Sequence, residues 1–307
     1  MRYGDIAFFG DSFTWGEGLE LYSTDQKWIT QRNTKSTWLE IQPIQDEESI
    51  LFRESNRFPK LVTTHFKSNL LIDHQNGGSF RSLIVKLNPI LNDLDKPEIL
   101  IYQFSSFNRN DLCFEEDSSN FNCKCNICEV SAKYDASWPI TFDVIYKIIS
   151  DMYYGNLSEY QQHLKTQFSI KYNIDFDLPI DKLIDSVKTI EIAKSKIHLE
   201  YLFDTYFKKL ESDGVNVFFI DTWDNLARET LIENEYFVER VIPLVGYDDN
   251  SYVNYSEWES TFEHRRIIDE FPKTENAHPT LLQHQYIGKS IIDFLEKKNI
   301  KNKIKYI

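Results

Sequence analysis

The chain has 307 residues and a net charge of −14, because 48 acidic residues outweigh 34 basic ones. Its hydrophobic fraction of 41% is ordinary for a globular protein and excludes a disordered or collagen-like chain. The negative charge makes nucleic acid and anionic membrane surfaces poor partners. No apolar run approaches the roughly 18–20 residues that span a bilayer. The N-terminus has no signal-peptide layout, so we expect a cytoplasmic protein.

Four short apolar runs predict the strands of one parallel sheet. They cover residues 5–10, 69–73, 98–104 and 215–220. Helices are predicted at 79–91, at 181–210 with an apolar stripe of Ile190, Ala193, Ile197 and Tyr201, and from Thr280, where Thr280 and Gln283 suggest a capping box. Strands that alternate with helices indicate an α/β fold with helices on both faces of the sheet. Functional residues of such folds collect at the carboxyl ends of the strands.

Two stretches do not fit this alternation. Residues 113–180 are polar and irregular in pattern, and residues 229–270 are rich in aromatic side chains. A minimal fold of this type needs only about 200 residues. We therefore predict a single domain, 1–307, in which two irregular insertions form a cap over the site. The aromatic rings would suit stacking on sugars, or they form small cores within the insertions.

The most informative segment is GDSFTWGEG, residues 10–18, directly after the first strand. A serine between a strand and a helix exposes its hydroxyl at the sheet edge, where backbone amides favour a developing oxyanion. Ser12 is therefore a candidate nucleophile, and the alternative is an ordinary helix N-cap. The pattern is not G-x-S-x-G, which excludes the nucleophile elbow of α/β-hydrolases.

A serine nucleophile needs a base, and His278 has the best context for one. It lies in TENAHPT, residues 274–280, where the following proline fixes the loop and Glu275 can turn back toward the imidazole. The alternative is a surface-loop histidine. The remaining histidines are expected to be structural: His65, His74, His163, His198, His264 and His284.

Together, GDSFTWGEG near the N-terminus and a carboxylate-x-x-His-Pro near the C-terminus resemble the SGNH/GDSL hydrolase superfamily. The resemblance implies a three-layer α/β/α, flavodoxin-like fold with a central parallel sheet. It also implies a catalytic triad of Ser12, His278 and Glu275, with glutamate where the family has aspartate. A backbone carbonyl is the alternative group to orient the imidazole.

The same resemblance implies the oxyanion hole. Its donors would be the Ser12 amide, the Gly78 amide after the second strand, and the Asn108 side chain after the third. The glycine of the family's third block is missing here, and Asn110 is the competing alignment for Asn108. The implied reaction is hydrolysis of a small-molecule or carbohydrate ester through an acyl-enzyme, without a catalytic cofactor. The alternatives are an acyltransferase with the same Ser–His pair and a non-catalytic protein that retains the fold.

All four cysteines lie within sixteen residues, at Cys113, Cys123, Cys125 and Cys128. Four thiolates could hold a structural zinc ion that staples the first insertion. Because the spacing is not the paired C-x-x-C of zinc ribbons, free or disulfide-bonded cysteines are the alternative.

Overall fold

The computed structural model describes residues 5–10, 14, 16, 19, 47–74, 87, 90, 92, 96–104, 141–221, 231, 233–244 and 281–298. Its centre is a parallel sheet with the order β2-β1-β3-β4. The strands are β1 (Asp5–Gly10), β2 (Asn69–His74), β3 (Ile99–Phe104) and β4 (Asn216–Asp221). All four strands predicted from sequence are confirmed to within one residue at each end.

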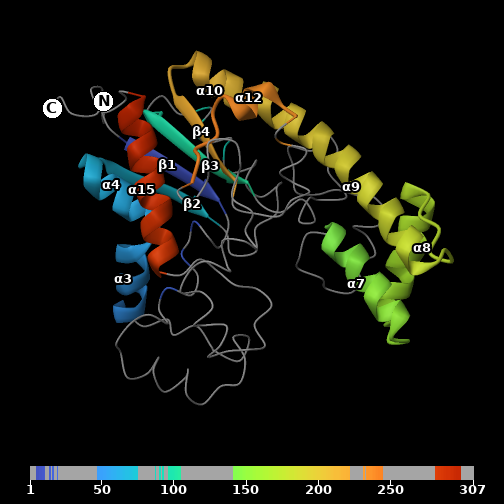
Figure 1. Ribbon diagram of the computed structural model, residues 1–307. Coiled ribbons are helices and arrows are strands. Elements are labelled where there is room, and N and C mark those ends of the chain that lie inside the picture. Colours follow the sequence, from blue (N-terminus) through green and yellow to red (C-terminus); the bar gives the residue numbers. More distant parts are fainter. Residues whose placement is uncertain are drawn as a thin grey trace.

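Side chains alternate along the strands and build one core on each face of the sheet. Ile6 and Phe8 of β1 face helices α4 (Phe58–Phe66) and α15 (Leu281–Lys297), which lie side by side in Figure 1. Helix α3 (Glu47–Asn56) precedes α4. The expected α/β arrangement, a parallel sheet covered by helices on both faces, is confirmed.

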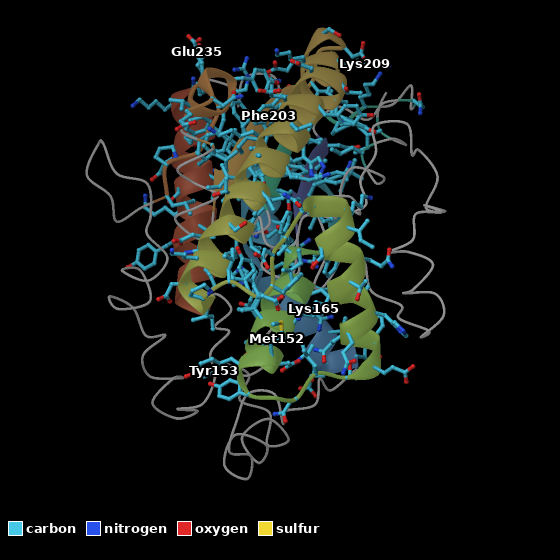
Figure 2. The ribbon with its side chains drawn as sticks, turned by 90° about the vertical axis from the view of Figure 1, so that its right-hand side faces the viewer. Met152, Tyr153, Lys165, Phe203, Lys209 and Glu235 are labelled. Atoms are coloured by element: carbon cyan, nitrogen blue, oxygen red, sulfur yellow. The ribbon has the colours of Figure 1, made fainter. Side chains whose placement is uncertain are left out.

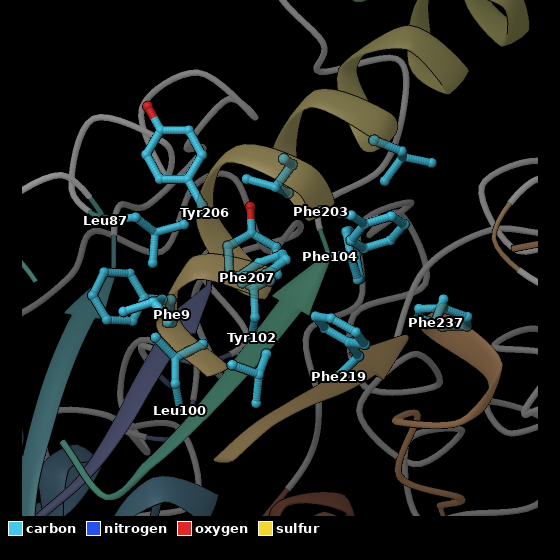
Figure 3. Close-up of a cluster of buried hydrophobic side chains, with 14 of the residues drawn as sticks. Phe9, Leu87, Leu100, Tyr102, Phe104, Phe203, Tyr206, Phe207, Phe219 and Phe237 are labelled. Carbon is cyan, nitrogen blue, oxygen red and sulfur yellow. The ribbon is translucent and has the colours of Figure 1, made fainter. Parts of the chain in front are cut away.

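The opposite face is covered by the C-terminal part of one nearly continuous helical segment. It consists of α9 (Ile180–Leu202), the π-helical turn η4 (Phe203–Phe207) and α10 (Lys208–Ser212). The aromatic rings of η4 pack edge-on or tilted against those of β3 and β4, among them Phe207 against Tyr102 at 5.0 Å between ring centroids. This aromatic core, drawn in Figure 3, also receives Phe237 from the short helix α12 (Glu235–Val238).

Part of the first predicted insertion is regular rather than irregular. Residues 141–179 contain α7 (Phe142–Tyr153) and α8 (Glu159–Tyr172), and a capping box of Ser158 and Gln161 starts α8. The two helices share a hydrophobic cluster with the first half of α9, separate from the two sheet cores. Figure 1 shows α7 and α8 beside the end of α9 that lies away from the sheet, and Figure 2 draws the side chains of these helices. The sequence pattern does not reveal this unit because α8 contributes only Leu164 and Phe168 to the buried cluster, and its partner helices supply most of the core. In the second insertion, the described residues include α12 and a bridge that pairs Val241 with Phe219 of β4.

The helix predicted at 181–210 is confirmed, but its predicted stripe is only half confirmed: Ile190 and Tyr201 pack at the edges of two cores, and Ala193 and Ile197 are exposed. Ile197 is 53% exposed, whereas Glu191, Ser195 and His198 are buried on the inner face of α9. Tyr146 of α7 donates its hydroxyl hydrogen to Glu191 at 2.5 Å. The stripe is only partly correct because α9 links two cores and is covered by different parts of the chain along its length. Between those cores its buried face is polar, which an apolar periodicity cannot detect.

His198 makes folding sensitive to acid. Burial, followed by the positive charge of Lys194, lowers the pKa of His198 to about 4. The imidazole of His198 binds a proton more readily in the unfolded chain than in the folded one. Its contribution to stability is therefore fully present above the unfolded pKa and is lost as the pH falls toward 4. Between pH 7.5 and 4.5 we expect the free energy of unfolding to fall by roughly 2–3 kcal/mol more in the wild type than in His198→Gln. Urea unfolding at the two pH values measures this.

The exposed His65, which pairs with Glu296, provides the matched control His65→Gln. It should retain the acid sensitivity of the wild type. If His198→Gln retains the same acid sensitivity, another group is responsible for it.

Candidate functional site at the carboxyl edge of the sheet

The strand order places a topological switch point between β1 and β3. From β1 the chain crosses to β2 on one side, and from β2 it returns to β3 on the other. Ligands of open α/β sheets bind at the carboxyl ends of the strands beside such a point. The ends that meet here are Gly10 of β1 and Phe104 of β3, and Gln103 lies beside them.

Three described residues lock this junction together. The Thr14 hydroxyl donates a buried hydrogen bond to the Gln103 side-chain oxygen, and both residues are only 1% exposed. A β-carbon added at Gly10 would overlap the Thr14 side chain and lie 2.6 Å from the Gln103 oxygen. Glycine is therefore required at position 10 for steric reasons. Residues 11–13, which include Ser12, connect two residues that are fixed against each other.

Gly16 fixes the next part of the same segment. Its φ is +82°, a conformation that favours glycine, and an added β-carbon would lie 2.9 Å from Leu19 and 3.1 Å from Arg57. Within GDSFTWGEG, Gly10 is thus needed for close packing, and Gly16 is needed for its backbone conformation.

The start of α15 is fixed against the start of α4. The Phe58 backbone N–H donates to Nδ1 of His284 at 3.2 Å, and the His284 ring stacks on Phe58 with 5.5 Å between centroids. His284 is fully buried. Its structural role is the one predicted from sequence. Because Nδ1 accepts a hydrogen bond, the ring is neutral in this arrangement.

The predicted catalytic residues lie outside the described residues. These are Ser12, His278 and Glu275 of the triad, Gly78, Asn108 and Asn110 of the oxyanion hole, and the cysteines Cys113, Cys123, Cys125 and Cys128. The structure describes residues that neighbour them in the sequence. Gly10 and Thr14 flank Ser12, β3 ends four residues before Asn108, and α15 begins three residues after His278.

Within the described ranges, no group of three or more His, Cys, Asp or Glu side chains could hold a metal ion. Among the same residues, no helix is long and apolar enough to cross a membrane.

Sequence reasoning missed four residues that build this edge. Thr14 and Gln103 form the buried hydrogen bond, and Arg53 and Arg57 pack beside Gly16. The position of Thr14 within GDSFTWGEG and of Gln103 at the end of an apolar strand offered a signal for the first pair. The two arginines carried none, since charged residues on a polar helix ordinarily face solvent.

No protein-family model matches the chain, and no curated protein matches it. Solved structures with a similar fold include an acetyl xylan esterase from the rumen bacterium Butyrivibrio proteoclasticus, at 10% identity and a TM-score of 0.39, with 98% of this chain and 66% of that chain covered. A second is a carbohydrate esterase described as having divergent catalytic and non-catalytic binding functions in its active site (12% identity, TM-score 0.39, coverage 98% and 67%).

A third similar structure is a carbohydrate esterase family 2 enzyme with a carbohydrate-binding domain from Corynascus thermopiles (Myceliophthora fergusii). Its identity is 10%, its TM-score 0.33, and the coverage is 96% of this chain and 66% of that chain. The chain thus spans about two thirds of the length of these structures. At such TM-scores the likeness assigns no activity to this chain.

Proposed function

We propose that the protein is a serine esterase of the SGNH type. The observation that carries the proposal is the close-packed junction of Gly10, Thr14 and Gln103 at the switch point. Residues 11–13, which contain the candidate nucleophile, connect Gly10 to Thr14 within this junction. A nucleophile must be held in position against its substrate, and misplacement by about 1 Å can cost about 10²-fold in rate. A junction of this kind is what such a segment needs.

In the proposed mechanism, His278 takes the proton of the Ser12 hydroxyl as general base, and Ser12 attacks the ester carbonyl. Glu275 orients the imidazole. The amides of Ser12 and Gly78 and the side chain of Asn108 stabilise the oxyanion, each donor contributing about 10²–10³ in rate. His278 then protonates the leaving alcohol, and water hydrolyses the acyl-enzyme. The reaction needs no cofactor, and a zinc ion on Cys113, Cys123, Cys125 and Cys128 would be structural.

For the substrate we propose an acylated carbohydrate. Two adjacent aromatic side chains at the end of α7, Tyr153 and the C-cap residue Tyr154, are each 70% exposed, with their rings edge-to-face at 5.2 Å. Exposed aromatic faces suit stacking on sugar rings. Phe237, by contrast, is buried in the aromatic core, and Tyr236 packs against it, which fits the alternative that aromatics of the second insertion serve packing.

Release of acetate from acetylated xylo-oligosaccharides tests the reaction and substrate class together. We expect acetate release by the purified protein, with little change when a sugar alcohol is added as acceptor. Transfer of most acetyl groups to the added alcohol would instead identify an acyltransferase. Absence of turnover on these sugars and on p-nitrophenyl acetate would favour a non-catalytic protein.

A further inference from the structure

Two arginine side chains are buried next to each other at the carboxyl edge of the sheet. Arg53 is near the end of α3 and Arg57 is the N-cap of α4, with exposures of 3% and 6%. Both flank Gly16, since a β-carbon there would lie 3.1 Å from Cβ of Arg57 and 3.4 Å from Cγ of Arg53. Helix α4 ends just before the first residue of β2, so the end of α4 is at the amino edge of the sheet. The start of α4, where Arg57 lies, is therefore at the carboxyl edge.

The contacts of Arg57 leave most of its guanidinium group unused. Nε and Nη1 are buried and have no hydrogen-bond partner among the described residues. Nη2 lies 4.0 Å from the Glu54 carboxylate, beyond hydrogen-bond distance, and the Glu54 side chain is about half exposed. Burial lowers the pKa of Arg57, the charge of Glu54 opposes this, and the charge of Arg53 adds to it. Among the described residues, the one acid near Arg57 is therefore half-solvated, and the neighbouring charge of Arg53 further disfavours the charged form of Arg57.

The start of α4 does not itself call for an anion. The Phe58 N–H already donates to His284, Pro59 has no N–H, and the amides of Lys60 and Leu61 donate to the Arg57 carbonyl. The unused donors therefore belong to the Arg57 side chain and not to the helix. A planar guanidinium offers two parallel N–H groups that match a carboxylate.

A buried guanidinium whose nearest described acid lies 4.0 Å away and is half exposed keeps much of its charge uncompensated, and this destabilises the fold unless a further anion binds. We infer that Arg57, supported by Arg53, binds a carboxylate beside Gly16 at the carboxyl edge of the sheet. The carboxylate comes either from an acidic side chain of this protein or from a small carboxylate in solution. The inference concerns stability, so it stands or falls separately from the proposed esterase activity.

The sign of the stability change on removal of the charge tests this inference. Arg57→Met keeps an unbranched apolar side chain and deletes the guanidinium. If Arg57 binds a carboxylate of the chain, Arg57→Met strands that carboxylate and lowers Tm by about 10 °C. Arg57→Lys keeps the charge but not the paired donors, so its Tm should lie between those of the wild type and Arg57→Met. Lys60→Met, an exposed position on the same helix, is the matched control and should leave Tm within about 1 °C.

The source of the carboxylate follows from Tm measured in sodium acetate and in sodium chloride at equal ionic strength. A higher Tm of the wild type in acetate, absent in Arg57→Met, identifies a site for a carboxylate from solution. A lower Tm of Arg57→Met in both salts, without an acetate effect on the wild type, identifies a carboxylate of the chain.

The inference is overturned if Arg57→Met is as stable as the wild type or more stable, and acetate has no effect. If Arg57→Met does not fold, Arg57→Lys decides instead. A Tm several degrees below the wild type supports the inference, and an unchanged Tm in both salts overturns it.

Discussion

Replacement of Ser12 by alanine is expected to lower the rate of p-nitrophenyl acetate hydrolysis by at least ~10³-fold. Alanine lacks the hydroxyl that would form the acyl-enzyme, so the remaining oxyanion donors can only assist direct attack by water. Thermal unfolding of Ser12→Ala should match the wild type, because the junction of Thr14 with Gln103 is untouched. Initial rates at equal concentrations of folded protein measure the effect.

Ser212 provides the matched control. Its exposed hydroxyl donates to the Lys209 carbonyl in the last turn of α10, near the amino end of β4 and at the edge of the sheet opposite the switch point. Ser212→Ala should hydrolyse the ester at the wild-type rate. Comparable rates for Ser12→Ala and the wild type would contradict the nucleophile role and favour the alternative that Ser12 is a helix N-cap.

Replacement of Gly10 by alanine is the second large effect. The new methyl group would lie 2.6 Å from the Gln103 oxygen and overlap Thr14, so one of the two must move and their buried hydrogen bond breaks. Overpacking and an unsatisfied buried polar group each cost about 1–3 kcal/mol. We expect a loss of roughly 3 kcal/mol in the free energy of unfolding. Displacement of the segment beside Ser12 should also lower the esterase rate by about 10²-fold.

Gly288 supplies the control for this change. It lies inside α15, where an added β-carbon meets the Leu61 Cβ at 3.3 Å, a contact that Leu61 must relieve by a shift of a few tenths of an ångström, and the gain in helix propensity from alanine offsets that cost. Gly288→Ala should therefore change stability and activity little. Urea unfolding and ester hydrolysis on both variants make the comparison. If Gly10→Ala behaves like Gly288→Ala, the close packing at the switch point does not hold the nucleophile segment in place.

The strands were predictable from sequence because each is a short apolar run that ends in small or polar residues. β1, for example, is buried at all six positions and ends at the glycine that begins GDSFTWGEG. The long helix before β4 was predictable from its length and the turn that follows it. Its buried face was not, because Glu191, Ser195 and His198 face inward between two cores. An apolar stripe cannot predict a polar face that other parts of the chain cover.

The candidate site was predictable as a motif, but its supports were not. Ser12 and His278 stand out by their neighbours in the sequence, whereas Gln103 and Arg57 come from distant segments and gain their meaning from packing. A buried arginine is rare, so composition and periodicity place Arg57 in solvent. Long-range contacts of this kind appear only once the chain is folded.

Covalent trapping tests most directly whether Ser12 is the nucleophile of an esterase. The protein is incubated with an organophosphonate ester that phosphonylates activated serines, digested, and analysed by mass spectrometry. We predict one adduct per molecule, on the peptide that contains Ser12, with parallel loss of p-nitrophenyl acetate hydrolysis, and no adduct in Ser12→Ala. An unlabelled wild-type protein that still hydrolyses the ester, or an adduct on another residue, would contradict the account.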